Sequence, residues 1–405
     1  MFICVLFFVL SASIATGQDR EIVLGMSGAF SGATRSLGIE LYRGAAAYFA
    51  KINEQGGVHG NRIRILAYDD GYNPEPTVEN TIRLIREDHV FALFNYVGTP
   101  TTTRMLPLLA KFSDRHMYLF CPFTGANPMR REPYSKYVFN LRASYDQEVE
   151  ALVDNLVDMG KTRIAVLHQV DAYGRGGWQG VKKALSKHGL EITAEATYTR
   201  GMGINDDFHP QVDIIASRDP DAVICIASYA AAAGFIRDAR QSGLEVPIAN
   251  ISFVDAKMMH RLLIKAGEED DTDYTRNLVN SQVVPFYGSR NLPAVDEYKQ
   301  CMRKYRPKIP DKFECPGYEQ QGFGAVSFEG FLNAKMMVEL LRSLGPYPSR
   351  KDIKINMDRM YNIDIGLDRK ISFTPFLDQG LEQVYFITFR GDQIYPLRDF
   401  EEVLN

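Results

Sequence analysis

Hydroxyl side chains gather where a predicted strand meets a predicted helix, in the segment LFNYVGTPTTTRMLPLL at residues 93–109. Thr99 and Thr101 follow Gly98 and stand in the first turn of that helix. The first backbone N–H groups of a helix have no intrahelical acceptor, and the positive end of the helix dipole favours an anion. Hydroxyl groups beside those amides make a socket for a small carboxylate. We therefore predict that this strand end binds the carboxylate of a small ligand.

A second loop, CPFTGANP at residues 121–128, repeats this arrangement at the next predicted strand end. Thr124 supplies a hydroxyl, and Gly125 allows the backbone to approach a ligand closely. In an open α/β sheet, ligands bind in the crevice outside the C-terminal ends of the strands. Ordinary helix capping by threonine is the alternative for either loop alone. Two neighbouring loops of this kind favour a binding site.

The motifs of the common enzyme classes are missing. Residues 25–29 read GMSGA and miss the G-x-S-x-G nucleophile elbow because Ala29 replaces the last glycine, and neither HExxH nor CxxC occurs. The seven histidines are scattered and form no ligand spacing. Asp69 and Asp70 are adjacent at a strand end and point to opposite faces, so we expect them to form a turn. We predict a protein that is not an enzyme and holds neither a metal nor a cofactor; turnover abolished by Ser27→Ala would support a hydrolase instead.

Alternating strands and helices must position these loops. Predicted strands at residues 21–28, 62–71 and 90–98 are separated by predicted helices at residues 39–55 and 76–88. Repeated βαβ units imply a parallel sheet with helices on both faces. The alternation restarts after residues 140–143, which predicts a second α/β unit and a hinge. Helices at residues 294–306 and 324–345 should complete the first unit, and strands at residues 371–376 and 384–397 the second.

Composition is consistent with two globular units. The chain has 405 residues, 45% of them apolar, and its 46 basic and 50 acidic residues give a formal charge of −4. The charges are spread evenly, without a basic block, so we expect neither nucleic acid nor an anionic membrane surface as a partner.

The N-terminal segment predicts export. Residues 1–17, MFICVLFFVLSASIATG, hold an apolar run and end in small residues, which is typical of a secretory signal peptide; a buried N-terminal strand is the alternative. No later segment approaches the 18 to 20 or so apolar residues of a membrane helix, so we expect a chain that does not span the membrane. Cys121 and Cys225 close apolar runs and should be buried thiols, whereas a disulfide between Cys301 and Cys315 is left open.

Residues 25–74, with the skeleton SG…G…G…A…IN..GGV.G..I…DD..NP, resemble the branched-chain amino-acid class of type I periplasmic binding proteins, the soluble receptors of ABC importers. The resemblance continues through GTPTTT, PFTGANP, QVDAYGRG and SYAAAAGFIRDARQSGL. It implies an α/β fold with two Rossmann-like lobes joined by three crossover strands. The implied division is residues 18–141 and 280–373 for lobe 1, and residues 142–279 and 374–405 for lobe 2.

By position, the resemblance implies roles for particular residues. Thr99 would bind the ligand carboxylate through its hydroxyl and N–H groups, and the FTGA loop (Thr124, Gly125, Ala126) would bind both the ammonium and the carboxylate. Gly98 and Thr101, beside Thr99, are also predicted to contact the ligand. Tyr173 and Tyr229 would cover the ligand from lobe 2, with plain core packing as the alternative.

The sequence departs from this family at several positions. Ser252 stands where the family carries an acidic partner for the ligand ammonium, and charge-assisted hydrogen bonds are about twice as strong as neutral ones. Gly98 replaces a cysteine, and Leu37 replaces an aromatic residue beside the side-chain pocket. The resemblance implies a monomeric periplasmic protein that delivers an amino acid or related small carboxylate to ABC permease subunits. A ligand-sensing subunit of a signalling system with the same fold is the alternative.

Overall fold

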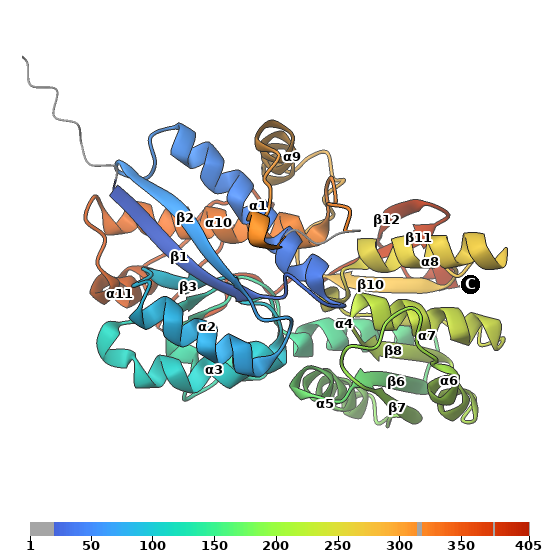
Figure 1. The fold of residues 1–405 in the computed structure, drawn as a ribbon. Helices are drawn as coiled ribbons and strands as arrows, with labels where there is room; N and C mark the ends of the chain where they lie inside the picture. Colours follow the sequence, from blue (N-terminus) through green and yellow to red (C-terminus); the bar gives the residue numbers. More distant parts are fainter. Residues whose placement is uncertain (1–19, 314–317, 376, 405) are drawn as a thin grey trace, which may run out of the picture.

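The computed structural model describes residues 20–313, 318–375 and 377–404. The predicted signal peptide and Cys315 lie outside these residues, so neither the export segment nor the open disulfide is tested. The chain forms two sheets with helices around each, and the sheets lie at opposite ends of an elongated molecule (Figure 1).

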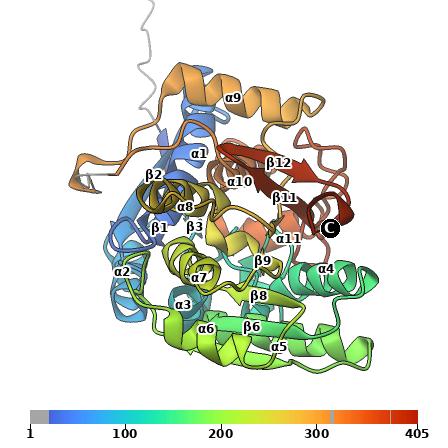
Figure 2. The ribbon, with the colours of Figure 1, turned by 90° about the vertical axis from the view of Figure 1, so that its right-hand side faces the viewer.

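The first sheet contains five strands, all in parallel pairs. Figure 2 shows the molecule from the end that holds the second sheet. Its strand order is β2 (Asn61–Asp69), β1 (Arg20–Gly28), β3 (Ala92–Phe94), β4 (Leu119–Phe120) and β5 (Val138–Phe139). The strands β2 and β1 pair along their whole length. The helices of this half are α1 (Arg35–Glu54), α2 (Pro74–Arg86), α3 (Thr99–Lys111), α9 (Pro293–Tyr305), α10 (Ala325–Leu344) and α11 (Ile353–Met357).

The second sheet contains seven strands in the order β12 (Gln393–Leu397), β11 (Tyr385–Arg390), β10 (Leu278–Gln282), β9 (Ile248–Asn250), β8 (Ala222–Ile226), β6 (Ile164–Gln169) and β7 (Ala194–Tyr198). The strands from β10 to β7 are parallel, whereas β11 and β12 join antiparallel. The strand β8 reads AVICI and is buried throughout, as expected for a parallel strand covered on both faces. Its helices are α4 (Tyr145–Asp158), α5 (Ala172–Lys187), α6 (His209–Ala216), α7 (Tyr229–Gln241), α8 (Ala256–Asp270) and α12 (Glu401–Leu404).

Within the described residues the chain passes between the two sheets three times: after β5, after β10 and between α11 and β11. Two of these passages lie side by side, because Asn140 N donates to Asp378 O at 2.8 Å and Leu381 N donates to Leu141 O at 2.8 Å. The predicted fold class, two α/β lobes joined by crossovers, is confirmed. The residue numbers given for the lobe boundaries stay predictions.

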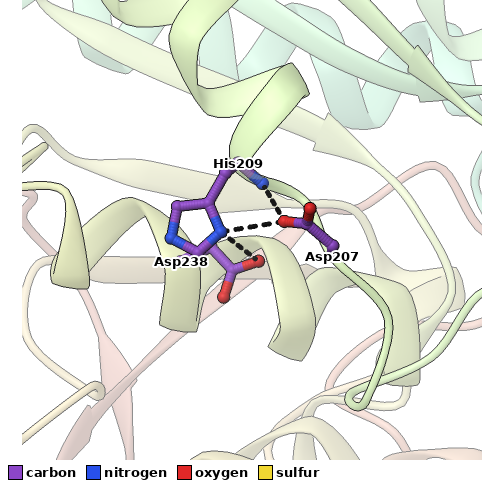
Figure 3. A group of neighbouring side chains, drawn as sticks. All are labelled: Asp207, His209 and Asp238. Atoms are coloured by element: carbon purple, nitrogen blue, oxygen red, sulfur yellow. Dashed lines mark hydrogen bonds and ion pairs between the residues drawn. The ribbon is translucent and has the colours of Figure 1, made fainter.

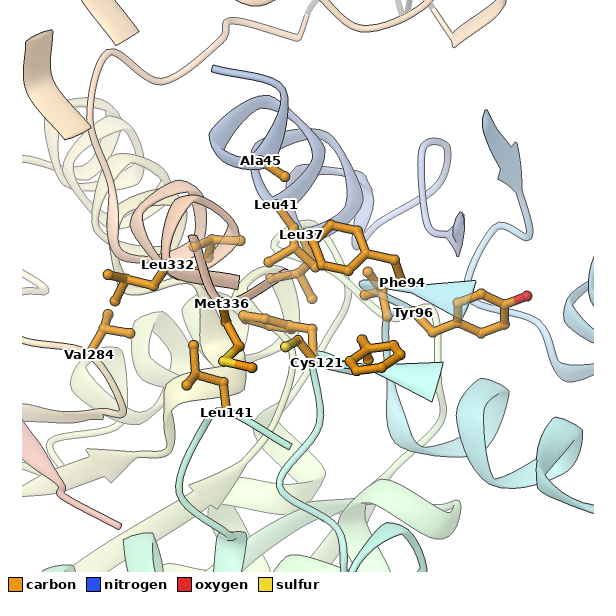
Figure 4. Packing of buried hydrophobic residues seen from close by; sticks show 14 of the residues in the cluster. Leu37, Leu41, Ala45, Phe94, Tyr96, Cys121, Leu141, Val284, Leu332 and Met336 are labelled. Carbon is orange, nitrogen blue, oxygen red and sulfur yellow. The ribbon is translucent and has the colours of Figure 1, made fainter. Parts of the chain in front are cut away.

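Packing of α1 against α10 forms the core of the first lobe. A Cβ atom on Gly44 would lie 1.7 Å from Ser327 O, and one on Gly330 would lie 2.1 Å from Leu41 O, so glycine is needed for these helices to approach. Figure 4 shows this core, to which Leu37, Leu41, Phe94, Leu332 and Met336 contribute.

The structure corrects one predicted strand and confirms the predicted burial of two cysteines. The predicted strand at residues 371–376 is not part of either sheet; Ile371 forms only an isolated bridge to Ile363, and Phe376 lies outside the described residues. Cys121 and Cys225 are buried, as predicted, and burial raises the pKa of both thiols. In the described part of the chain, no helix is both long and apolar enough to cross a membrane.

Candidate functional site

The two threonine loops meet through their hydroxyl groups. Thr99 begins α3, Thr124 lies between β4 and β5, and their Oγ1 atoms are 2.7 Å apart. Both side chains are buried, with exposed fractions of 1% and 0%. Backbone hydrogen bonds hold the loops together, from Gly98 N to Phe123 O at 3.2 Å and from Phe123 N to Tyr96 O at 2.7 Å. Thr99 and Thr124 are called the threonine pair below.

Gly98 and Thr101 shape the turn into α3. Gly98 has a φ of 98°, which favours glycine, and a Cβ atom there would lie 2.2 Å from the ring of Tyr72. Glycine is therefore required for both its backbone conformation and its lack of a side chain. The Thr101 hydroxyl donates to the carbonyl oxygens of Val97 at 2.5 Å and Gly98 at 2.9 Å. This hydroxyl is therefore committed to the backbone, and the Thr101 N–H group stands in the first turn of α3, where N–H groups have no intrahelical acceptor.

The second loop is held rigidly at Gly125 and Ala126. Gly125 O accepts from Tyr145 N at 2.8 Å, and a Cβ atom on Gly125 would lie 2.5 Å from the Tyr145 ring. Ala126 N donates to Thr124 Oγ1 at 3.2 Å. From behind the loop, Arg130 Nη1 donates to Thr124 O at 3.3 Å and to Ala126 O at 3.1 Å, and burial lowers the pKa of Arg130 to about 9.

Tyr145 adds a third hydroxyl beside the threonine pair, and the sequence analysis missed it. The Ser144 hydroxyl accepts from Gln147 N at 3.2 Å, and the Gln147 side chain accepts from Ser144 N at 2.8 Å, a capping box that makes Tyr145 the first residue of α4. Burial raises the pKa of Tyr145, although the hydroxyls of Thr99 and Thr124 oppose this shift.

Aromatic rings from both lobes cover the threonine pair. The Phe253 ring lies 4.6 Å from Tyr173, 5.7 Å from Phe123 and 5.8 Å from Tyr72, and Tyr173 lies 5.5 Å from Tyr145, measured between centroids. These five residues are called the aromatic cluster. Tyr173 is buried and its hydroxyl donates to Ala227 O at 3.1 Å. The structure therefore brings predicted Tyr173 close to the predicted threonine loops.

Ser252 belongs to a buried network of charged groups. Its N–H and its hydroxyl donate to the two carboxylate oxygens of Glu148 at 2.8 and 2.9 Å, and Arg142 Nη2 donates to its Oγ atom. The hydroxyl of Ser281 donates to Glu148 at 2.6 Å. The Ser252 hydroxyl is therefore bonded to two charged groups, the Glu148 carboxylate and the Arg142 guanidinium.

Arg142 was not singled out from the sequence, although it is an arginine inside the apolar crossing segment YVFNLRAS. Its side chain is 1% exposed, and its Cζ atom lies 4.5 Å from the centroid of Phe123. Nη1 is 3.6 Å from Glu329 Oε1, yet Nη1 and Nε make no hydrogen bond within the described structure. Burial alone would lower the pKa of Arg142. The carboxylates of Glu329 and Glu148 have the opposite effect, and the pKa of Arg142 is raised above its usual value.

Tyr229 lines a groove between the lobes to which the threonine pair does not contribute. The groove has a volume of about 740 Å³, and its walls come from both lobes and include Arg35, Arg261 and Tyr318. Beneath this groove Ser36 Oγ, in α1, donates to Asp255 Oδ2 at 2.6 Å. Asp255 caps α8 and also accepts from Gln321 Nε2 at 2.9 Å, so the lobes are directly bonded here.

Asp69 and Asp70 form a turn, as predicted. Asp69 Oδ1 accepts from the N–H groups of Phe30 and Gly71 at 2.8 and 2.9 Å, and Asp70 Oδ1 accepts from Tyr72 N at 2.9 Å. Burial raises the pKa of Asp70 to about 7. This turn places the Tyr72 ring in the aromatic cluster.

A separate group, Asp207, His209 and Asp238, comes together only in three dimensions, with its possible ligand atoms within 4.8 Å of one another (Figure 3). Its oxygens already accept from the protein: Asp207 from His209 Nδ1 at 2.8 Å, and Asp238 from Phe208 N and Arg237 Nε at 2.7 Å. The hydrogen bond to Asp207 raises the pKa of His209. We assign this group to anchoring the start of α6 on α7.

Comparisons with known proteins agree with this architecture. The family described as "Periplasmic binding protein" matches residues 21–393. A protein of Pseudomonas aeruginosa named "Amino acid binding protein" is 26% identical over 232 residues, which cover 57% of this chain and 60% of that protein. The "Leu/Ile/Val-binding protein" of Escherichia coli K12 is 24% identical over 286 residues, 69% of this chain and 72% of its own. The crystal structure of a "possible leucine/isoleucine/valine-binding protein" from Rhodopirellula baltica SH 1 aligns with a TM-score of 0.84 and 29% identity, over 96% of this chain and 98% of that one.

Proposed function

Because the chain belongs to the periplasmic binding protein family, we propose that it captures an amino acid or a related small carboxylate between its lobes and delivers it to the permease subunits of an ABC importer. It acts as a monomer outside the cytoplasmic membrane and makes or breaks no bond. Ligand binding shifts the equilibrium between separated and closed lobes, and the permease reads the closed form.

The observation that carries this proposal is the threonine pair at the start of α3. Two buried hydroxyls 2.7 Å apart, the N–H groups of a 13-residue helix and the Tyr145 hydroxyl converge at one place. Donors at the positive end of a helix dipole favour an anion over a neutral group. The aromatic cluster spans both lobes above the pair and would exclude water from the bound ligand.

A thermal-shift screen of ligand-stripped protein against amino acids, aromatic acids and short dicarboxylates tests the proposal. A ligand at 100 times its dissociation constant adds about 2.7 kcal/mol of stability. Thr99→Ala should weaken carboxylate binding by about 1 to 3 kcal/mol, because it leaves buried polar groups unpaired. Thr103→Ala is the matched control on the same helix, since the Thr103 hydroxyl has no hydrogen-bond partner within the described structure. Equal affinity of the two variants and the wild type would show that the threonine pair is not the carboxylate site.

Uptake measurements test delivery to an importer. Cells that lack this chain should lose import of the identified ligand, and the wild type should restore it better than Thr99→Ala. Import that persists at full rate without the chain, despite tight binding in solution, would favour a sensing role.

A further inference from the structure

The buried guanidinium of Arg142, close to the threonine pair, carries hydrogen-bond donors without a partner. Arg142 leaves Nε and Nη1 without hydrogen bonds within the described structure. A guanidinium nitrogen can only donate, and a buried one left unpaired is costly. A ligand that supplies acceptor oxygens, such as a carboxylate, would satisfy these groups.

Most carboxylates near the aromatic cluster are already satisfied by the protein. Each of three accepts several hydrogen bonds: Glu148 from Ser252 and Ser281, Asp171 from Tyr173, Gly174 and Gln169, and Asp255 from Ser36, Gln321 and Met258. A ligand ammonium ion would share these carboxylates with the donors already bound to them, and it would lie near the Arg142 charge. Buried ammonium groups need a paired anion, so this environment disfavours them.

Glu329 differs from these three carboxylates because its contact in this region is an ion pair with Arg142. One of its oxygens lies 3.6 Å from Arg142 Nη1. Glu329 therefore competes with a ligand carboxylate for the same guanidinium nitrogen. Burial raises the pKa of Glu329 to about 7, so its neutral form is accessible near neutral pH and leaves Arg142 free for the ligand.

The apolar surroundings indicate the shape of the ligand body. The threonine pair is covered by the aromatic cluster, and Phe123 carries the Arg142 guanidinium on one ring face. Flat rings stack favourably on such side chains in offset or edge arrangements. An aromatic ligand body could stack on these rings, which a branched aliphatic one cannot do.

We propose that the ligand is a monocarboxylate with an aromatic body and no α-ammonium group, and that the buried guanidinium of Arg142 selects it. This inference rests on the function proposed above and narrows the class of ligand. Arg142 repels a ligand ammonium and donates to carboxylate oxygen, while the threonine pair and Tyr145 complete the anion site.

Two matched ligand pairs test this selectivity by titration calorimetry on ligand-stripped protein. 3-Phenylpropanoate and L-phenylalanine differ only in the α-ammonium, as do 4-methylpentanoate and L-leucine. We expect 3-phenylpropanoate to bind at least tenfold more tightly than both L-phenylalanine and 4-methylpentanoate. An amino acid that binds as tightly as its amine-free partner would overturn the inference and leave the proposed function standing. Binding of none of the four, nor of any compound in the wider screen, would overturn both.

Variants separate the role of Arg142 from that of Glu329. Glu329→Gln removes the competing carboxylate, so 3-phenylpropanoate should bind as tightly or more tightly. The double variant Arg142→Gln with Glu329→Gln avoids leaving Glu329 as an unpaired buried charge, and it should lose at least tenfold affinity relative to Glu329→Gln alone, in protein that still unfolds in one cooperative transition. Full affinity in the double variant would exclude Arg142 as the selecting group. A loss of amino-acid binding in Glu329→Gln alone would make Glu329 an ammonium partner and also overturn the inference.

Discussion

Replacing Ser36 with alanine should weaken ligand binding although Ser36 lies outside the threonine pair and the aromatic cluster. The Ser36 hydroxyl, on α1 of the first lobe, donates to Asp255 Oδ2 at 2.6 Å, at the start of α8 in the second lobe. This hydrogen bond can form only when the lobes are together. The substitution therefore destabilises the closed form and leaves each lobe intact.

The structure sets the size of the effect. Ser36 and Asp255 are both buried, and a hydrogen bond to a charged group contributes about 1.5 to 3 kcal/mol. Burial raises the pKa of Asp255 and so opposes the charge that strengthens this hydrogen bond. Gln321 Nε2 still donates to Asp255 at 2.9 Å, so the carboxyl keeps a partner. We expect a loss of about 1 to 2 kcal/mol in binding, or roughly 5- to 30-fold in the dissociation constant.

Titration calorimetry measures this loss, and small-angle scattering reports the separation of the lobes. The unliganded variant should have a radius of gyration at least as large as that of the wild type and the same melting temperature. Ser217→Ala is the control, because the Ser217 hydroxyl donates only within its own helix end, to Ile214 O at 2.8 Å. An unchanged dissociation constant for Ser36→Ala would refute the idea that this bond stabilises the closed lobes.

Two further predictions concern stability. Burial raises the pKa of Glu329 from 4.5 to about 7, so the folded state keeps a proton that the unfolded state releases, and stability falls as pH rises through this window. Glu329→Gln removes this term, so its stability relative to the wild type should rise by on the order of 2 to 3 kcal/mol between pH 4.5 and 8 in urea unfolding, and a change of opposite sign would contradict the assignment. Gly98→Ala should cost at least about 2 kcal/mol, because Gly98 has a φ of 98° and the new Cβ would lie 2.2 Å from the Tyr72 ring. Gly160→Ala, at a φ of 75° with no atom within 4 Å, should cost only about 1 kcal/mol, and equal losses would exclude the Tyr72 contact as a cause.

Local patterns were sufficient to predict the alternation of strands and helices. Runs such as AVICI at residues 222–226 and the helical spacing of α10 depend on which side chains are apolar, and that information is contained in short segments. The strand predicted at residues 371–376 was wrong for the same reason. It has strand-like composition, but whether it joins a sheet depends on a free partner edge elsewhere in the fold.

The sequence alone also pointed to the threonine loops, because parallel strands end at a common edge and the two loops follow neighbouring strands. It could not predict the distance between Thr99 and Thr124 or the position of the Tyr145 hydroxyl. Those depend on Gly98, Gly125 and their contacts with Tyr72 and Tyr145, which come from four different segments of the chain.

Only the tertiary structure decided the charges that surround the site and the contacts that close it. Arg142 meets Ser252 across 110 residues, and Ser36 meets Asp255 across 219 residues. Residue types at such separations carry no signal of proximity in a single sequence, because proximity arises when the crossovers bring the two sheets together. Short-range apolar patterning therefore predicted the strands and helices of two α/β units, whereas long-range packing determined which charged groups lie buried between them.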